Sequence, residues 1–450
     1  MEVIVIDTPQ LGDRTYLVHD GQFALVIDAQ RDIDRVEAAA AAAGVTVTHV
    51  AETHLHNDYV TGGFAYAAKH GSAYLVNAAE SVSFERTPIA HGETVRVGEL
   101  TVRAVATPGH THKHLSFVVE HGDQQAVFSG GSVLYGSVGR TDLLGHDHTV
   151  GLTHDQYASA RRLAEEARAA AALYPTHGFG SFCSVSPAAD ATGSTLGEQF
   201  ATNPVYTDQD EEHFVSELIA NLTVFPSYYA HMSPRNLTGP TEADLSVPDS
   251  LDPEELRARL AAGEWVVDLR NRVAYAAEHL RGTISFEYGT GKAWPTYLGW
   301  LFPYDRKLTL VGSRDDVENA IRDLSRIGID SPDAALGEDP RRLAPNAPVS
   351  SYPRATWQEV AAQRQPDETI LDVRRAEEHK ATRVDGSVNI PIHELLSRLD
   401  ELPSGKIWVH CASGYRAGVA ASLLDREGRD VVHIDDSFAQ APAAGLPIAS

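Results

Sequence analysis

The sequence has few cysteines, no long apolar run and no excess of positive charge. Its two cysteines, Cys183 and Cys411, lie far apart in the chain, which argues against a disulfide framework and favours a reducing, cytoplasmic setting. Because no run of about 18 apolar residues occurs, no transmembrane helix is expected. The formal net charge of −25 disfavours binding to nucleic acid or to anionic membranes. The first residues carry no basic segment, so no signal peptide is expected.

Residues 1–235 are predicted to form an α/β domain with large sheets, because short β-rich runs alternate with helical patterns. The β-rich runs are 2–7, 16–28, 45–51, 73–76, 101–106, 116–120 and 126–129. The helical patterns are 32–43, 63–70 and 155–172. The proline-bearing stretch 233–253 is predicted to be a linker.

The remainder of the chain contains an internal repeat. Residues 252–270 and 356–374 each begin with a capping box, continue through a helix and end in a strand with the pattern Asp-x-Arg. The shared positions are Asp252, Glu255, Asp268, Arg270 and Gly282 in the first copy and Thr356, Glu359, Asp372, Arg374 and Gly386 in the second. A proline-rich stretch, 331–353, separates the copies. We therefore predict three domains, at 1–235, 250–332 and 353–450.

In the second copy, Cys411 stands at the end of a hydrophobic strand, and a helix begins near Arg416. The short loop between them, Ala412, Ser413, Gly414 and Tyr415, can point its amide N–H groups inward. These amides and the positive end of the helix would stabilise a thiolate, which is a nucleophile. A packed core cysteine is the plain alternative. A cysteine phosphatase is another, but its loop holds one more residue than this one.

The segments 371–374, 386–391 and 410–418 resemble a rhodanese-type sulfurtransferase domain in order and spacing. The resemblance implies that Cys411 accepts a sulfane sulfur as a persulfide, held by the loop amides and by Arg416. In the first copy, Gly312 aligns with Cys411 and Val317 aligns with Arg416, so this copy is expected to be inactive. Its remaining use would be as an interface or scaffold, which allows a homodimer.

The N-terminal part contains histidines on three loops that follow predicted strands. The stretch 53–63, THLHNDYVTGG, supplies His54, His56 and Asp58. A Pro-Gly turn supplies His110, and the segment 174–183 supplies His177. Histidines that converge from several strand ends are typical of a metal site. The histidines of 146–148 and His154 lie in a polar stretch, and we interpret them as a solvated loop.

The ordered set His-x-His-x-Asp, Pro-Gly-His, Gly-Arg-Thr-Asp with Asp142, and Pro-Thr-His-Gly resembles the metallo-β-lactamase superfamily. This implies an αββα sandwich with a metal cleft at one edge. Followed by two rhodanese-like copies, it resembles the persulfide dioxygenase–rhodanese fusions of bacterial sulfide detoxification. The segment 225–239 fits that subgroup. Cys183 fits it as well, although a packed, inert thiol is an equal interpretation.

Two positions depart from the superfamily pattern. Tyr59 stands where a second-site histidine is expected, and Gly131 stands where a metal-binding aspartate is expected. A two-metal hydrolase site and a two-His-one-carboxylate iron site are therefore both incomplete. His54, His56 and His110 remain as a ligand set for one Fe(II) or Zn(II) ion, and the other outcome is no metal. Three residues are candidates for an additional ligand or for supporting the ligands: Asp58, Asp142 and His177.

Three functions follow from these features. In the first, the N-terminal domain oxidises a low-molecular-weight persulfide, such as glutathione persulfide, and Cys411 exchanges sulfur with an acceptor such as sulfite. In the second, the protein is a rhodanese-type sulfurtransferase only, and its metallo-β-lactamase-like domain is a non-catalytic binding module. In the third, the three-histidine site is a mononuclear zinc hydrolase of thioesters or lactams.

Overall fold

The protein, described here by a computed structural model that covers residues 1–185, 193–289 and 293–449, divides into two compact units. The first comprises Met1–Asp244 with Asp323–Asp330, and the second comprises Leu245–Arg322 with Ser331–Ser450. Both sequence repeats lie in the second unit, apart from residues 323–330. Among the described helices, none combines the length and the hydropathy that a membrane span requires.

Two six-stranded sheets form the centre of the first unit. The first sheet has the order β1 (Glu2–Thr8), β2 (Asp13–His19), β3 (Phe23–Ile27), β4 (Thr46–Ala51), β5 (Ala73–Asn77), β6 (Thr87–Ile89). The second has the order β14 (Ser194–Thr195), β13 (Ala172–Pro175), β10 (Gln124–Gly130), β9 (Leu115–His121), β8 (Leu100–Ala106), β7 (Thr94–Val97). A separate hairpin consists of β11 (Val133–Leu134) and β12 (Ser137–Val138).

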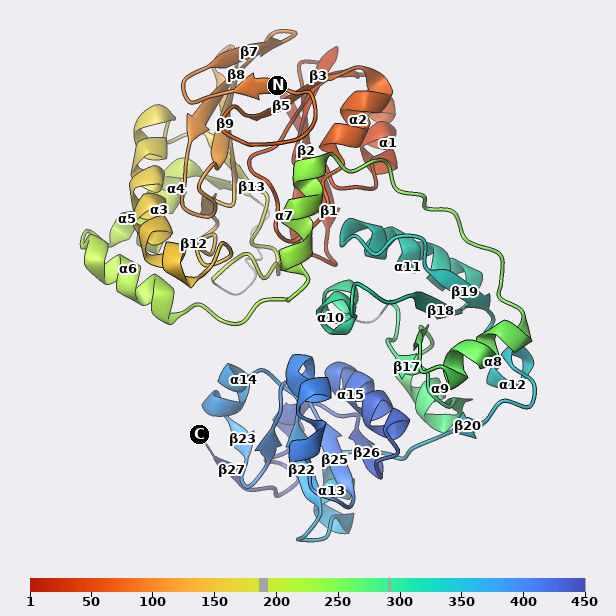
Figure 1. Cartoon of the computed structure of the whole chain (residues 1–450). Coiled ribbons are helices and arrows are strands. Elements are labelled where there is room, and N and C mark those ends of the chain that lie inside the picture. The colour runs from red at the N-terminus through yellow and green to blue at the C-terminus, as the bar shows by residue number, and fades with distance from the viewer. Residues whose placement is uncertain (186–192, 290–292, 450) are drawn as a thin grey trace. The chain divides into compact units, whose positions relative to one another are not determined.

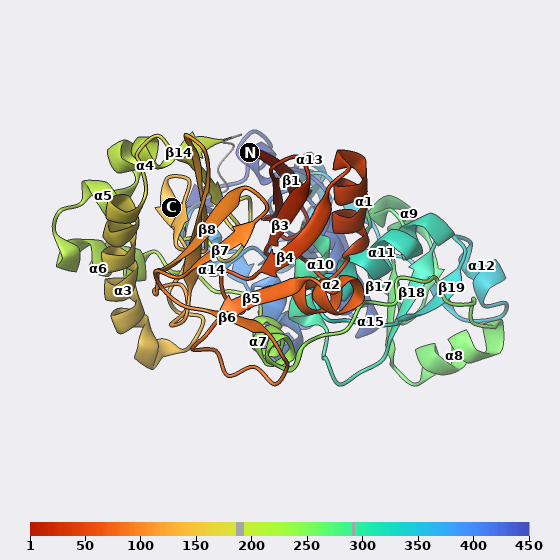
Figure 2. The same cartoon turned by 90° about the horizontal axis from the view of Figure 1, so that it is seen from above.

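Helices cover the outer faces of the two sheets, so the first unit has the expected αββα layers (Figure 2). Alternate apolar side chains such as Leu25, Val102 and Phe117 pack between the sheets. The helices of this unit are α1 (Asp34–Ala43), α2 (Gly63–His70), α3 (His146–Glu166), α4 (Leu196–Thr202), α5 (Pro204–Thr207), α6 (Glu211–Ala220) and α7 (Tyr229–Thr238). α1 and α2 pack on the first sheet, and α3 packs on the second. The loops that follow the strands are therefore free to form a site at the sheet edge.

The N-terminal part of α3 was wrongly predicted as a loop. The helix begins at His146, so His146, His148 and His154 are helical, although His146 and His148 do face solvent. Only Thr149, Leu152 and Thr153 of the first turns are buried, which is too little apolar periodicity to predict a helix.

The predicted linker 233–253 was also partly wrong, because α7 continues through Pro234 to Thr238. This helix is held by tertiary contacts rather than by its own sequence pattern. The amide group of Asn236 donates to the carbonyl oxygens of His56 and Tyr59, each at 2.9 Å, and its oxygen accepts from the Thr61 N–H. α7 therefore fixes the histidine-bearing loop after β4.

The second unit contains two parallel sheets (Figure 1). One has the order β17 (Ile284–Ser285), β15 (Trp265–Asp268), β18 (Leu308–Gly312), β19 (Asp333–Leu336). The other has the order β24 (Val388–Asn389), β22 (Thr369–Asp372), β25 (Ile407–His410), β26 (Val431–Ile434), β21 (Arg354–Ala355). The helices are α8 (Pro253–Ala261), α9 (Arg272–Ala277), α10 (Trp294–Leu301), α11 (Arg314–Arg326), α12 (Pro340–Leu343), α13 (Trp357–Gln363), α14 (Ala376–Ala381) and α15 (Tyr415–Arg426). Short pairs are β16 (His279–Leu280) with β20 (Val349–Ser350) and β23 (Arg383–Val384) with β27 (Ile448–Ala449).

The two repeats share the order of four strands and their Asp-x-Arg geometry, as duplication predicts, and the second sheet adds β21 at its edge. The Asp268–Arg270 ion pair closes at 2.7 Å and the Asp372–Arg374 ion pair closes at 2.6 Å. In each pair the arginine also donates to a backbone carbonyl eight residues onward, that of Glu278 in one copy and of Thr382 in the other. The repeat in the sequence is thus a repeat of structure.

Candidate functional site

Three histidines from three loops meet at one edge of the sandwich. His54 follows β4, His110 follows β8 and His177 follows β13. All three are buried, and each offers one ligand atom within 4.8 Å of the other two. The predicted candidate His177 therefore belongs to the centre of the site.

The geometry of this cluster fits a metal ion. The Nε2 atoms of His54 and His177 lie 3.4 Å apart. Two nitrogens on a tetrahedral zinc ion, each bound at about 2.0–2.1 Å, would be about 3.3 Å apart. The His110 ring uses Nδ1 for the carbonyl oxygen of Arg140 at 2.7 Å, and its buried Nε2 has no partner. Such a nitrogen is ready to bind a metal.

Carboxylates fix the orientation of His177. Its Nδ1 lies 2.8 Å from Asp13 and 3.2 Å from Asp58. Histidine ligands commonly use their second nitrogen in this way, so Asp58 supports a ligand here. Although burial alone would lower the pKa of His177, Asp58 and Asp13 raise it well above its usual range. Metal binding would displace that proton.

The other two histidines are neutral. Burial, reinforced by neighbouring imidazoles, lowers the pKa of His54 well below its usual range. Burial also lowers the pKa of His110 to about 3. Neutral imidazole is the form that binds a metal.

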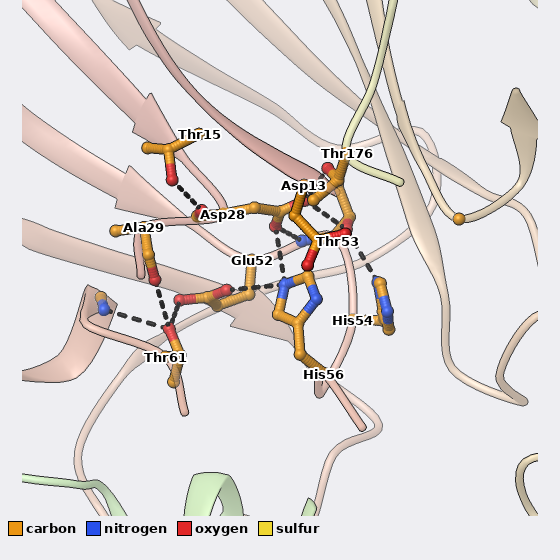
Figure 3. A network of polar contacts seen from close by, with 12 residues as sticks. Asp13, Thr15, Asp28, Ala29, Glu52, Thr53, His54, His56, Thr61 and Thr176 are labelled. Atoms are coloured by element: carbon orange, nitrogen blue, oxygen red, sulfur yellow. Dashed lines mark hydrogen bonds and ion pairs between the residues drawn. The ribbon is translucent and has the colours of Figure 1, made fainter. Parts of the chain in front are cut away.

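His56, predicted as a ligand with His54 and His110, is directed elsewhere. Its Nε2 lies 3.3 Å from both Asp28 and Glu52, as Figure 3 shows. Burial would lower the pKa of His56, but the two carboxylates raise it to about 9. His56 is thus placed as a buried cation here, while His177 completes the group formed with His54 and His110, and the role of His56 as a ligand stays a prediction. His56 also lies in two further groups that could hold an ion, one with Asp58 and His177 and one with Asp28 and Glu52.

A second site lies in the second unit, where the buried Cys411 follows β25. The Gly414 N–H donates to the Cys411 sulfur at 3.2 Å. Gly414 has φ +92°, and an added Cβ there would collide with Asp435. Ala412 and Ser413 are exposed, so the loop faces solvent. The predicted arrangement of strand, loop and helix is therefore present.

The Arg416 guanidinium is bound to a carboxylate in this structure. It forms two parallel hydrogen bonds with Glu378, at 2.6 and 2.9 Å. Its contact with the charged sulfur stays a prediction. In the first repeat, β18 runs through Gly312, the residue aligned with Cys411, and α11 begins two residues later. That copy has neither the thiol nor the loop.

Comparison with known proteins identifies the two domains in which these sites lie. A family model for the metallo-beta-lactamase superfamily matches residues 11–177, and a model for the rhodanese-like domain matches residues 356–441. The chain joins a metallo-β-lactamase domain to a C-terminal rhodanese-like domain.

Several known proteins are similar to parts of this chain. The crystal structure of a metallo-beta-lactamase from Staphylococcus aureus is 25% identical, with a TM-score of 0.67, and covers 75% of this chain and 99% of its own. The ETHE1 structure from Myxococcus xanthus is 26% identical, with a TM-score of 0.45, and covers 52% of this chain and 98% of its own. An atrochrysone carboxyl ACP thioesterase from Aspergillus fumigatus is 32% identical over 39% of this chain and 40% of its own. This chain thus matches about two fifths of the length of that curated relative.

The metallo-β-lactamase domain also relies on residues that the sequence analysis did not identify. The Asp28 carboxylate accepts from the N–H and the hydroxyl of Thr53, both at 2.7 Å, and from the hydroxyl of Thr176. It therefore ties together the ends of β3, β4 and β13. Both Asp28 and Glu52 directly follow apolar strands, and this pattern could have revealed them.

Asp142, one of the predicted candidates, lies outside the histidine cluster. Asp142 is held by Arg140 at 2.6 and 2.7 Å. Gly131 has no side chain, and its N–H donates to Nε2 of His114 at 2.9 Å. Cys183 is fully buried, and its sulfur lies 3.9 Å from the Tyr229 hydroxyl.

Proposed function

We propose that this protein processes the sulfane sulfur of low-molecular-weight persulfides. Cys411 would carry sulfur as a persulfide, and the metallo-β-lactamase domain would oxidise glutathione persulfide or a similar thiol persulfide. The observation that carries the proposal is the hydrogen bond from the Gly414 N–H to the Cys411 sulfur, at the start of α15. A backbone donor aimed at sulfur stabilises a thiolate or a persulfide anion.

Sulfur transfer at Cys411 needs no cofactor. The thiolate attacks the sulfane sulfur of thiosulfate, the S–S bond breaks, and sulfite leaves with the electron pair. The new persulfide carries the negative charge near Gly414 and Arg416. Attack by sulfite on the terminal sulfur reverses the step and regenerates thiosulfate. A persulfide-oxidising site that releases sulfite would supply this acceptor.

The three histidines suit one ferrous or zinc ion, since imidazole binds both. A ferrous ion at His54, His110 and His177 would bring O2 and the sulfane sulfur together, for the overall reaction RSSH + O2 + H2O → RSH + HSO3⁻ + H⁺. The protein contributes orientation: Asp13 and Asp58 hold His177, and the Arg140 carbonyl holds His110. All three histidines are buried, which limits their contact with bulk solvent.

The test begins with Cys411. After treatment with thiosulfate, we expect mass spectrometry to find one added sulfur atom on the peptide that contains Cys411. Cys411→Ser should abolish both the label and sulfurtransferase activity, whereas the control Cys183→Ala should keep the label. An unlabelled Cys411 in a folded protein would overturn the sulfurtransferase assignment.

Hydrolysis of thioesters is the second candidate, and the curated relative named a thioesterase favours it. The two functions differ in their products. Iron-loaded protein that consumes O2 with glutathione persulfide and releases sulfite would support oxidation. Zinc-loaded protein that releases thiol from acyl thioesters, without O2 uptake in the iron-loaded form, would support hydrolysis. Sulfur transfer at Cys411 with neither oxidation nor hydrolysis would mean that the metallo-β-lactamase domain is a binding module.

A further inference from the structure

The end of α11 belongs to the first unit, although the rest of the inactive repeat lies in the second. Residues 323–330 form this part of the chain. Side chains of the metallo-β-lactamase domain hold it at two points: Arg31 forms an ion pair with Asp330, and Arg235 of α7 donates to the carbonyl oxygen of Gly328. A short piece of the inactive repeat is therefore built into the domain that carries the histidine cluster.

One residue of this segment, Arg326, contacts two loops of the metallo-β-lactamase domain. Its carbonyl oxygen accepts from the Val60 N–H at 2.7 Å. Its guanidinium donates to both carboxylate oxygens of Asp32, at 3.1 and 2.6 Å. Val60 lies on the loop after β4, and Asp32 lies on the loop after β3. Arg326 therefore links the loop that bears His54 to the neighbouring loop.

The contact between Arg326 and Asp32 is buried and has a fixed geometry. The Arg326 side chain is 5% exposed and the Asp32 side chain is fully buried. The same guanidinium donates to Asp323 at 2.6 Å, and Arg35 also donates to Asp32, at 3.1 Å. Arginine–carboxylate pairs with two hydrogen bonds are specific in orientation. The side chain of Arg326 therefore anchors its own carbonyl oxygen beside Val60.

The Val60 N–H lies close in sequence to a residue that supports the metal ligands. Asp58, two residues earlier, lies 3.2 Å from Nδ1 of His177. Thr61, the next residue, is held through its N–H by Asn236. Val60 itself is fully buried, and an unpaired buried N–H is costly. The bond from Val60 to segment 323–330 therefore helps to fix the backbone that carries Asp58.

This contact is particular to the inactive repeat. In the aligned repeats, the residue opposite Arg326 is Asp425, in the copy that carries Cys411. Asp425 pairs with His279 at 3.1 Å within the second unit. An aspartate could not take the place of Arg326, because its charge would repel that of Asp32. The repeat that lacks the thiol is thus the one whose sequence suits the metallo-β-lactamase domain.

We propose that Arg326 is a positioning residue of the metal centre. Acting through Val60, it holds the loop that supplies His54 as a ligand and Asp58 as the partner of His177. The inactive repeat thereby contributes to the N-terminal site without any sulfur chemistry of its own. The inference rests on the metal centre of the proposed function, whether that centre oxidises persulfides or hydrolyses thioesters.

Titration of the full-length protein with Co(II) tests this role without turnover. The visible absorption bands of bound Co(II) report the geometry of its ligands. Arg326→Met should change these bands and weaken Co(II) binding about tenfold, as the loss of residues that orient metal ligands does. The double variant Arg326→Met, Asp32→Asn leaves no carboxylate without its partner, so it should fold and show the same change.

Hydrogen–deuterium exchange of the metal-free protein is the second readout. Residues 53–63 should exchange faster in Arg326→Met than in wild type. Arg259→Met is the matched control, because Arg259 is also buried, 10% exposed, and pairs with Glu255 and Asp333 in the second unit. It should lower the temperature of thermal unfolding but change neither the Co(II) bands nor the exchange of residues 53–63.

The outcomes separate positioning from plain stabilisation. Unchanged Co(II) bands in both Arg326 variants would overturn the proposal, even with faster exchange, because the contact would then be structural only. The same change of bands in Arg259→Met would overturn it as well. A wild-type protein that binds no Co(II) would overturn the metal centre and this role together. Co(II) binding that depends on Arg326, without sulfite from glutathione persulfide, would refute the oxidase function and keep the positioning role.

Discussion

The ring of His110 occupies the space that a side chain at residue 131 would need. A Cβ atom added to Gly131 would lie 2.6 Å from Cγ and 2.9 Å from Nε2 of His110. The ring cannot move away freely, because its Nδ1 is bound to the Arg140 carbonyl and the residue is fully buried. The space beside Gly131, where an aspartate side chain would begin, is therefore filled by the ring of His110.

Restoring the aspartate should consequently fail to restore a carboxylate ligand. We expect Gly131→Asp to lower metal content, because the new side chain displaces His110 from His54 and His177. Gly131→Ala should already cost about 1–3 kcal/mol of unfolding free energy through overpacking. Elemental analysis and thermal unfolding measure both effects. Gly151→Ala on α3, where an added Cβ meets nothing within 4 Å, is the matched control. Higher metal content in Gly131→Asp would contradict this account.

His177 and His56 should have opposite effects on metal binding and stability. His177→Ala removes one of three clustered ligands, so the metal content of the folded protein should fall by most of its value. His56→Ala should keep metal binding but leave Asp28 and Glu52 buried without their cation, at a cost of about 3–5 kcal/mol. Elemental analysis and urea unfolding of both variants measure the two quantities. The exposed His70→Ala serves as a control. Metal loss in His56→Ala, with His177→Ala unaffected, would restore the superfamily ligand set.

The features that could be predicted from the sequence are those marked by a short local motif. The strand-end loops of His54, His110 and Cys411 were found because apolar strands and turn residues mark them locally. The contacts of His56 with Asp28 and Glu52 were not predictable, because these two carboxylates come from the ends of separate strands. Local patterns also do not show which distant side chain forms hydrogen bonds with the backbone groups of a loop. The structural role of α7 depends on Asn236. Its amide group donates to the carbonyl oxygen of His56, which lies 180 residues earlier in the sequence.

The first repeat should not gain sulfur chemistry from a single cysteine. In the second repeat, three residues separate Cys411 from α15, whereas only Ser313 separates Gly312 from α11. Ser313 is already used, since its hydroxyl accepts from the Asp316 N–H at 3.1 Å and lies 2.7 Å from the Asp316 carboxylate. Gly312→Cys in a Cys411→Ser background should therefore remain unlabelled by thiosulfate. Mass spectrometry of that peptide gives the answer, with wild-type protein as the positive control. A persulfide at position 312 would show that the loop amides are dispensable.

The Glu378–Arg416 ion pair should make the stability of the rhodanese-like domain depend on acid pH. Burial alone would raise the pKa of Glu378, but Arg416 lowers it to about 2. A carboxyl group whose pKa is lower in the folded state stabilises the fold at every pH above its pKa in the unfolded state, which is about 4.3 for glutamate. This contribution is lost as the pH falls toward the folded-state pKa of about 2. Because the Glu378 side chain is 24% exposed, we expect a contribution on the order of 2 kcal/mol.

Urea unfolding of wild type and Glu378→Gln, from neutral pH down to about pH 3, measures this contribution. The difference in unfolding free energy between the two proteins should be largest at neutral pH and should shrink steadily below about pH 4. Glu401→Gln is the control, because Glu401 pairs with Arg398 at a more exposed position, 51% for its side chain, and should show a smaller difference. If the difference in unfolding free energy between wild type and Glu378→Gln did not change with pH, Glu378 would stabilise the fold by packing. The ion pair between the Glu378 carboxylate and Arg416 would then contribute nothing.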